Sequence, residues 1–415
     1  MDNQNLQGRA KVVLVSCVLF NLFLGILYAW TVLRSHLENT YGWTVAQGAL
    51  PFSLAIGFFA VFMFIGGRIQ DKIGPRWVMT AGGAFVGGGV IIGGLFGGTN
   101  PLYITIAFGI IAGIGGGLGY ACATPPAVKW FHASKKGTIS GCTVGGFGLA
   151  ATYMSPLVGA LLIAVGLQRT MIFMGIGIAI LTILCAQFVK NPPEGYIAPA
   201  PENFTAKAAS AAPSVDYTWT DMMKTRLFWM IFIMFISSAF VGLALIGTSG
   251  TIASVQLGLS PTPAATLAMV IAIANTLGRV LGGMLSDKIG RINTFYLMLI
   301  VQSATMIAFL FFSELWHLII GVAIVGACFG AFLAVFPAIT ADQFGLKNLG
   351  KNYGIMFLAW GIAGFINAPI QGLLIGEGSG AFNAVYIFCA IVTGAMIVVN
   401  FLIKKDIDRL NAKAQ

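Results

Sequence analysis

Long apolar stretches follow one another along the whole chain of 415 residues, separated by short segments that carry charges, glycine or proline. Twelve of these stretches are long enough to cross a bilayer, since a transmembrane helix needs about 20 apolar residues. In hydrocarbon every backbone N–H and C=O must be bonded inside the protein, so we expect each stretch to be a helix and the whole to be an all-α membrane protein. The predicted helices lie near residues 11–33, 46–66, 77–96, 101–128, 137–164, 168–189, 226–257, 262–284, 292–313, 316–338, 351–376 and 380–403.

The composition excludes several other classes of protein. Only 9% of the residues are charged, whereas a soluble domain uses about 25%, so a soluble enzyme, a disordered chain and a secreted disulfide scaffold are excluded. The net charge of +10 comes from cations scattered between apolar stretches, unlike the concentrated basic face of a nucleic-acid-binding protein. The cysteines lie in apolar stretches without metal-ligand spacing, so we predict buried thiols and neither a metal nor another cofactor. They are Cys17, Cys122, Cys142, Cys185, Cys328 and Cys389.

One hydrophilic segment divides the chain. Residues 190–225 contain several prolines and an Ala/Ser-rich stretch, a composition that is typical of a flexible linker and cannot bury a core. We therefore predict an N-terminal six-helix bundle (residues 1–189), a cytoplasmic linker (190–225) and a C-terminal six-helix bundle (226–415). We expect the protein to work as a monomer.

The distribution of cations predicts the orientation in the membrane. When the N-terminus is placed in the cytoplasm, all of the 23 Lys and Arg residues except Arg34, Arg169 and Arg279 fall on that side, which leaves 20 there. This asymmetry matches the positive-inside rule. We therefore expect a multi-pass protein of a cell's inner membrane with both termini in the cytoplasm. The first apolar stretch is long enough to remain in the membrane, so we do not expect a cleaved signal.

The two halves repeat a charged loop. GGRIQDKIGPR follows the second predicted helix and GGMLSDKIGR follows the eighth, which places Asp71 and Asp287 216 residues apart, about half the chain. An Asp near a helix end can accept hydrogen bonds from the N-terminus of a neighbouring helix and from Arg or Lys. One copy could be an ordinary tight turn, but two at equivalent positions indicate a repeat. We predict an inter-bundle latch formed by Asp71, Arg76, Asp287 and Arg291.

The duplicated G-x-x-x-D-K-x-G pattern, the twelve predicted helices and the central linker resemble the major facilitator superfamily over essentially the whole chain. The resemblance implies a transporter and not an enzyme, in which two six-helix bundles rock about a site near the bilayer midplane. Tyr28-Ala29-Trp30, Asn352-Tyr353-Gly354 and the loop after the fourth helix are similar to the oxalate:formate antiporter family, and that loop also resembles the animal monocarboxylate transporters. The matching loop residues are Trp130, Phe131, Lys135, Lys136, Gly137, Ser140, Gly141, Gly145, Gly146 and Gly148.

Arg279 is the one cation that the predicted loops do not contain. It lies eight residues before Asp287 and therefore about 12 Å deeper along the helix, inside the hydrocarbon region, where no acidic residue is predicted. A cation at that depth costs about 3 kcal/mol or more, which an anionic ligand in a water-filled cavity would offset. The alternative is a structural arginine that reaches the inner surface or pairs with a loop acid such as Asp342. The resemblance implies substrate binding, because both related families have their carboxylate-binding arginine at this position.

Further residues are candidates to complete the site. Asn275 lies four residues before Arg279 on the same helix face, where its amide would hold a carboxylate oxygen or join two helices. Tyr120 and Tyr28 match family positions, and each phenol would donate to a small anion or simply pack.

Trp360 is an informative departure from the family pattern, because the oxalate carriers have a second cation at this position of the predicted helix 351–376. One arginine neutralises one carboxylate, so Trp360 favours a monocarboxylate over a dianion, and its bulk favours a short chain. Phe329 and Phe332 are possible further lining residues, although phenylalanines in such a helix more often belong to the core.

We therefore expect a secondary transporter of a small monocarboxylate, lactate or pyruvate, that moves together with a proton. The residues that are implicated in proton coupling in the animal carriers are not present in this chain. Asn275 replaces their acid, and Val32 replaces their lysine. Two alternatives remain: an anion exchanger of the oxalate:formate type, and a facilitator of neutral solutes in which Arg279 is structural. An intramembrane enzyme is not expected, since no helix offers paired carboxylates or a metal constellation.

Overall fold

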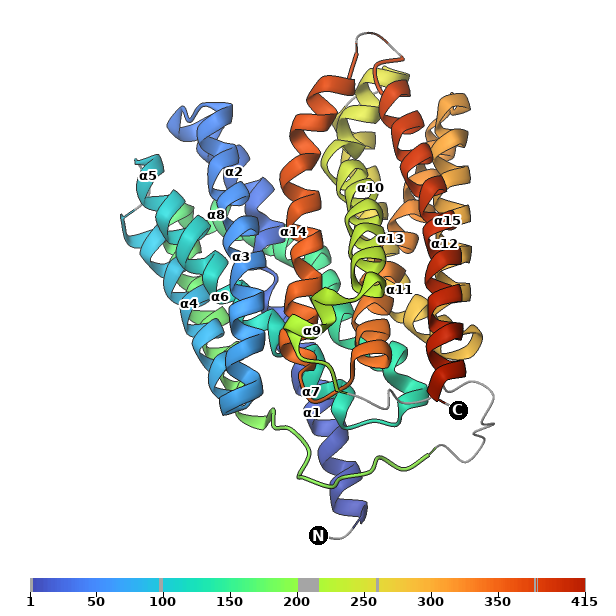
Figure 1. Cartoon of the computed structure of the whole chain (residues 1–415). Coiled ribbons are helices and arrows are strands. Elements are labelled where there is room, and N and C mark those ends of the chain that lie inside the picture. Colours follow the sequence, from blue (N-terminus) through green and yellow to red (C-terminus); the bar gives the residue numbers. More distant parts are fainter. Residues whose placement is uncertain are drawn as a thin grey trace. The chain divides into compact units, whose positions relative to one another are not determined.

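The computed structural model of the protein describes residues 3–96, 100–200, 216–258, 261–376, 378 and 380–414, and the regular structure in these ranges is helical (Figure 1). The all-α prediction is confirmed. Residues 201–215 of the predicted linker lie outside the described ranges. The α-helices are α1 (Asn3–Leu24), α2 (Trp30–Tyr41), α3 (Val45–Ile73), α4 (Pro75–Phe96), α5 (Pro101–Ile104), α6 (Gly113–Ala121), α7 (Thr124–Lys129), α8 (Lys136–Phe188), α9 (Trp219–Lys224), α10 (Arg226–Leu257), α11 (Pro261–Ile289), α12 (Arg291–Ala308), α13 (Leu315–Phe344), α14 (Leu349–Leu374) and α15 (Asn383–Ala414).

The described residues contain eleven helical stretches that are long and apolar enough to cross a membrane. Two of the twelve predicted helices, 137–164 and 168–189, run together in α8, which explains the lower count. Within α8 the backbone leaves the helical conformation at Gly166, where φ is 77°. Glycine adopts this left-handed conformation without a steric penalty, so the bend separates two spans inside one continuous stretch.

Two predicted helices are interrupted where candidate site residues lie. The first predicted helix stops at Leu24, continues as a 3-10 turn over Ile26–Ala29 that carries Tyr28, and resumes as α2. The fourth contains a π-helical segment, Thr105–Ala112, directly before α6 and Tyr120. Irregular turns of these kinds inside long helices are frequent at functional sites.

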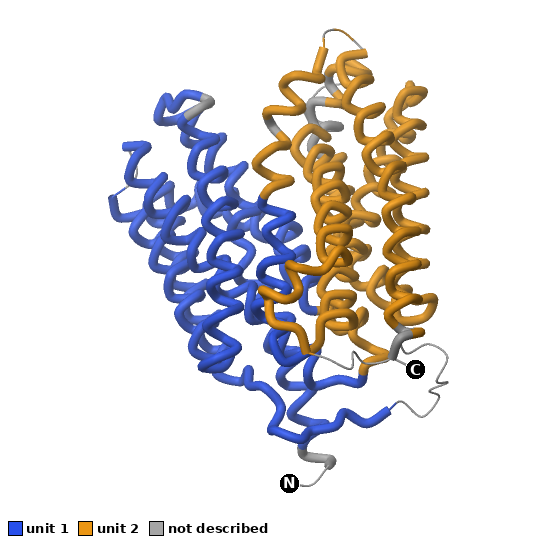
Figure 2. The backbone as a smooth tube through the Cα atoms, in the orientation of Figure 1, with its two compact units in different colours: residues 1–132, 143–200, 346–361 blue, residues 133–142, 201–345, 362–415 orange. Residues whose placement is uncertain are grey.

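The chain forms two compact units (Figure 2). Unit 1 consists of residues 1–132, 143–200 and 346–361, and unit 2 of residues 133–142, 201–345 and 362–415. The helix α8 therefore begins in unit 2 and continues in unit 1, whereas α14 begins in unit 1 and continues in unit 2. The predicted division at residues 190 and 226 follows the chain order and stays a prediction.

Glycine allows close helix packing in unit 1. A Cβ added at Gly82 of α4 would lie 2.7 Å from the backbone nitrogen of Gly119 in α6, and one at Gly115 would lie 2.5 Å from that of Val86. Such short distances require a residue without a side chain. Small residues that let backbones approach are the usual means of packing helices in membranes.

Aromatic side chains fill the core of unit 2. The rings of Phe235 in α10 and Phe336 in α13 stack with 4.0 Å between their centroids, and Phe295 of α12 lies 5.1 Å from Phe336. These contacts join three long helices around one buried row. The row lies next to α11, which packs against all three helices and carries Arg279.

Candidate functional site

Arg279 lies in α11, within the candidate membrane span Thr266–Ile289. Its residue is only 2% exposed, and its Nε donates a 2.8 Å hydrogen bond to Oδ1 of Asn275, which is also buried. The predicted neighbours on one helix face are therefore in contact. The amide oxygen fixes one edge of the guanidinium, which has five N–H donors in a planar fork suited to a carboxylate.

Two glycines hold the backbone around Arg279. A Cβ at Gly330 of α13 would lie 2.8 Å from the backbone nitrogen of Arg279 and would also meet the carbonyl oxygen of Asn275. A Cβ at Gly141, in the first turns of α8, would meet the carbonyl oxygen of Arg279. The helix turn that presents Arg279 is thus enclosed by α13 and by the first turns of α8, and these parts of both helices belong to unit 2. The sequence did not predict a role for Gly330, because a glycine indicates close packing but does not indicate which segment packs against it.

Phe329 and Phe332 flank Gly330 and point into the packing of unit 2. Phe329 is buried against α10, where a side chain at Gly242 would collide with its ring. Phe332 stacks with Phe295 at 6.0 Å between ring centroids. These contacts are typical of residues in the packed core of the unit. A role of Phe329 and Phe332 in lining the substrate site stays a prediction.

The other three candidates share an aromatic cluster in unit 1, which we define as Tyr28, Phe59, Tyr120, Phe147, Phe357 and Trp360. Tyr28 and Tyr120 both contact Phe147, with ring centroids 5.4 and 5.2 Å away. Trp360 stacks on Phe357 with 5.2 Å between the ring centroids. The ring of Tyr120 also contacts Phe357, with 5.4 Å between the centroids. The structure therefore brings together three residues from distant parts of the sequence.

The aromatic cluster is not closed to its surroundings. Tyr120 is buried, whereas Tyr28 and Trp360 remain partly exposed. Tilted and stacked rings at these spacings hold one another in fixed orientations. Such a wall combines a rigid apolar surface with the hydroxyls of two tyrosines, which is suited to a small, partly apolar solute.

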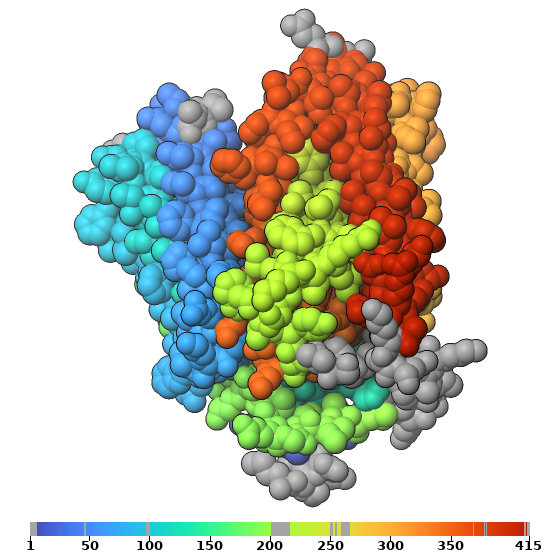
Figure 3. All heavy atoms as spheres, in the orientation of Figure 1, coloured from blue at the N-terminus to red at the C-terminus, as the bar shows by residue number. Residues whose placement is uncertain are grey.

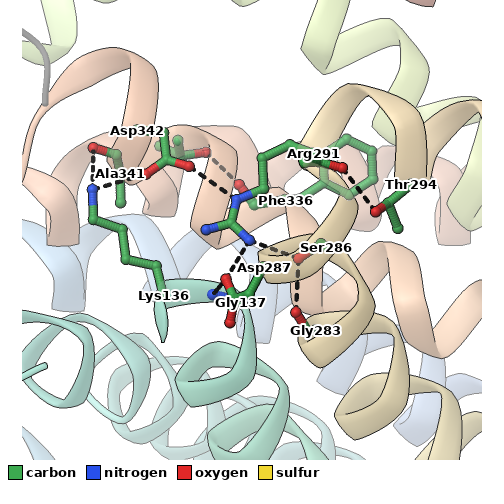
Figure 4. A network of polar contacts seen from close by, with 12 residues as sticks. Lys136, Gly137, Gly283, Ser286, Asp287, Arg291, Thr294, Phe336, Ala341 and Asp342 are labelled. Atoms are coloured by element: carbon green, nitrogen blue, oxygen red, sulfur yellow. Dashed lines mark hydrogen bonds and ion pairs between the residues drawn. The ribbon is translucent and has the colours of Figure 1, made fainter. Parts of the chain in front are cut away.

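The second repeated loop forms a dense polar network in unit 2 (Figure 4). Asp287 accepts hydrogen bonds from the backbone N–H groups of Gly137 and Thr138 at 2.8 and 2.6 Å, and from the Thr138 hydroxyl at 2.6 Å. Nη1 of Arg291 donates to the same carboxylate at 2.5 Å. A carboxylate at the first turn of α8 bonds N–H groups that have no partner inside the helix and meets the positive end of its dipole.

Asp342 at the end of α13 extends this network. Its carboxylate accepts from Nζ of Lys136 at 2.8 Å and from Nε of Arg291 at 2.9 Å, and its side chain is 2% exposed (Figure 4). Two acids and two bases thus balance within one buried cluster. The alternative that Asp342 pairs with Arg279 is not what these bonds show, because both of its oxygens are bound by other cations.

The first repeated loop makes a related contact in unit 1. Oδ2 of Asp71 accepts from the backbone N–H of Lys351 at 2.9 Å, in the first turn of α14, and Nζ of Lys129 lies 3.9 Å from Oδ1. Arg76 does not repeat the behaviour of Arg291: it donates to Oε1 of Gln187 at 2.8 Å and lies over the ring of Trp77. Both acids therefore bind a helix start, and the latch role of all four residues stays a prediction.

Neither metals nor disulfides enter the site in the part of the chain that the structure describes. No group of three His, Cys, Asp or Glu side chains there is placed to hold a metal ion. The six cysteines are free thiols, five of them buried.

The chain is similar to known transporters over most of its length. The family model described as Major Facilitator Superfamily matches residues 14–315 and 242–414. The uncharacterized MFS-type transporter YhjX of Escherichia coli K12 is 29% identical over 363 residues, which cover 87% of each chain. The oxalate:formate antiporter of Oxalobacter formigenes is 28% identical over 393 residues, which cover 94% of this chain and 90% of the relative. FucP in its outward conformation shares the fold, with a TM-score of 0.73 at 13% identity over 94% of this chain and 98% of that one.

Proposed function

The chain belongs to the Major Facilitator Superfamily of membrane transporters, and from that premise we propose that it carries a small monocarboxylate, such as lactate or pyruvate, together with a proton. Arg279 binds the carboxylate, Asn275 orients the guanidinium, and Tyr28, Tyr120 and Trp360 shape the rest of the site. The protein spans the inner membrane of a cell with both termini in the cytoplasm.

The observation that carries this proposal is the placement of Arg279. An arginine that is 2% exposed within a candidate membrane span is expensive to keep there, by about 3 kcal/mol or more. The amide oxygen of Asn275 accepts from Nε of Arg279 at 2.8 Å and so fixes the orientation of the guanidinium. A carboxylate that binds to the planar fork by two parallel hydrogen bonds would cancel the charge and gain from the low dielectric.

The size and charge of the substrate follow from Trp360. The indole stacks on Phe357 at 5.2 Å and lies 6.0 Å from Phe59, so it presents an apolar surface where the oxalate carriers have a second cation. A single cation and an apolar wall suit a monoanion with a short apolar chain. A dianion would need a second cation, which Trp360 does not supply, so its second carboxylate would lose its hydration without a matching charge.

Exchange of anions is the second candidate function. It is favoured by the similarity to a protein named as an oxalate:formate antiporter. A carrier whose site holds a buried cation changes conformation less readily without its anion, so the return step would require a second anion. The two candidates share Arg279 and differ in what drives uptake.

Uptake of labelled lactate into proteoliposomes separates the candidates. One set of vesicles has an imposed pH gradient, acidic outside, and the other is preloaded with lactate or oxalate. Symport predicts concentrative uptake driven by the pH gradient, whereas exchange predicts uptake only with internal anion. Both predict that Arg279→Gln abolishes uptake and that Arg169→Gln, at an exposed arginine of α8, retains it. Uptake that survives Arg279→Gln would contradict both and indicate a structural arginine.

A further inference from the structure

A pocket of about 270 Å³, lined by charged and apolar residues that do not include Arg279, lies in unit 2. Its lining includes Arg226 and Leu227 at the start of α10, Phe344 at the end of α13, and Asp406, Arg409 and Leu410 at the end of α15. The candidate membrane spans of these helices begin or end at Arg226, Phe344 and Leu410. We therefore expect the pocket to lie at the depth where the helices leave the hydrocarbon and meet the lipid headgroups.

The charged residues of the pocket leave it positive. Arg226 and Arg409 have side chains that are 63% and 62% exposed, and each approaches the carboxylate of Asp406 to 3.8 Å, which is longer than a hydrogen bond. One acid thus faces two cations, so the lining carries one net positive charge. Lys404, Lys405 and the acid Asp408 are exposed on the same stretch of α15 and together add one further net positive charge.

Apolar surface continues from the pocket along the two helices. Leu227, Phe344 and Leu410 form part of the lining itself. Farther into the membrane, Trp229 of α10 and Phe401 of α15 expose large apolar side chains, 46% and 57% of their surface. The two helices pack against each other, and Figure 3 shows the yellow-green surface of α9 and α10 next to the red surface of α15. A ligand with an anionic head and an apolar tail would match both parts of this surface.

We propose that the pocket binds the phosphate of an anionic phospholipid, with Arg226 and Arg409 as its ligands and the acyl chains along α10 and α15. Basic pockets between membrane helices at the cytoplasmic surface bind lipid headgroups in this way. Guanidinium groups bind phosphate oxygens by two parallel hydrogen bonds, which a lysine cannot do. The site is independent of Arg279 and of the transported solute.

The test is lipid binding to the full-length purified protein, freed of native lipid in a neutral detergent and titrated with phosphatidylglycerol or phosphatidylcholine under native mass spectrometry. Arg226→Gln/Arg409→Gln weakens binding of phosphatidylglycerol about 25-fold, because each basic residue near the surface is worth about fivefold in affinity. Phosphatidylcholine binding is unchanged. The matched control, Arg68→Gln/Lys72→Gln, removes the same charge from exposed positions at the end of α3 and leaves the affinity within about twofold.

A variant that is expected to tighten lipid binding distinguishes the loss of the two arginines from misfolding. Asp406→Asn removes the acid that competes with phosphate, so it tightens phosphatidylglycerol binding by about fivefold. Inorganic phosphate at the same concentration does not displace the lipid, because it lacks the apolar contacts. Displacement by inorganic phosphate would overturn the lipid and indicate a site for free phosphate. Equal weakening in the control pair, or no tightening in Asp406→Asn, would overturn the pocket itself.

Discussion

Asp71 and Asp287, which lie 216 residues apart, each accept a backbone N–H from the first turns of another long helix. Asp287 binds the start of α8, and Asp71 binds the start of α14. In both cases the acid and the helix start come from different halves of the sequence, yet they belong to the same compact unit. Both copies of the loop therefore bind the start of a helix, but Asp287 makes more hydrogen bonds there than Asp71 does.

The two acids are predicted to differ in their contribution to stability. Asp287→Asn disrupts three hydrogen bonds to α8 and the ion pair with Arg291, and we expect it to cost about 2–3 kcal/mol more than a neutral surface change. Asp71→Asn disrupts a single backbone bond and a longer ion pair, so we expect a smaller loss. Melting temperatures of the detergent-purified variants measure the order, and a larger fall for Asp71→Asn would contradict it.

The bond between Lys136 and Asp342 is predicted to be strongly coupled. Lys136→Met leaves a buried carboxylate with one of its two cations, and a broken buried pair of this kind costs about 3–5 kcal/mol. Lys136→Met/Asp342→Asn removes both partners and should cost less than the sum of the single changes. A thermodynamic cycle of the four proteins, followed by thermal unfolding, gives the coupling. Additive effects would show that the two side chains do not stabilise each other.

Gly330 is predicted to control the position of Arg279. Gly330→Ala forces α13 away from α11 because the new Cβ would lie 2.8 Å from the backbone of Arg279. We expect about tenfold weaker substrate binding, equivalent to about 1.4 kcal/mol. Gly88→Ala is the matched control, since a Cβ there has no neighbour within 4 Å and removes only backbone freedom in α4. Substrate titrations of both variants by intrinsic fluorescence make the comparison.

Trp360 is predicted to restrict the charge of the substrate. Trp360→Lys places a second cation beside the aromatic cluster, so we expect the ratio of oxalate to lactate affinity to rise about tenfold or more. Trp360→Phe keeps the apolar wall and should leave the ratio unchanged. Competition of each acid against labelled lactate measures the ratio. A ratio that does not change in Trp360→Lys would remove Trp360 from the site.

Local patterns were sufficient to predict several features of this protein. The apolar stretches predicted the helices, and the spacing of four residues predicted that Asn275 and Arg279 share a helix face, where the structure shows them in contact. Both depend only on neighbours within one helix. The repeat also predicted that Asp71 and Asp287 would meet helix N-termini, because their place at a helix end is a local property.

Contacts between distant segments were not predictable in this way. Lys136 and Asp342 are 206 residues apart, and nothing local distinguishes them from other charged residues near a membrane surface. Arg76 and Arg291 occupy equivalent positions in the repeat. Arg76 donates a hydrogen bond to Gln187, whereas Arg291 forms ion pairs with two acids. The two predicted helices 137–164 and 168–189 meet within α8 at Gly166, where the backbone leaves the helical conformation, but the bend itself was not predicted because a glycine between two apolar stretches is equally consistent with a bend and with a loop.

The most direct test of carboxylate binding at Arg279 is calorimetric titration of lactate into the purified protein, its Arg279→Gln variant and its Arg279→Lys variant. We predict measurable binding to the unchanged protein, none to Arg279→Gln, and weaker binding to Arg279→Lys, which keeps the charge but loses the planar fork. Thermal unfolding of each sample shows that the variants are folded. Equal affinity of the unchanged protein and a folded Arg279→Gln variant would contradict the assignment of Arg279 as the carboxylate ligand.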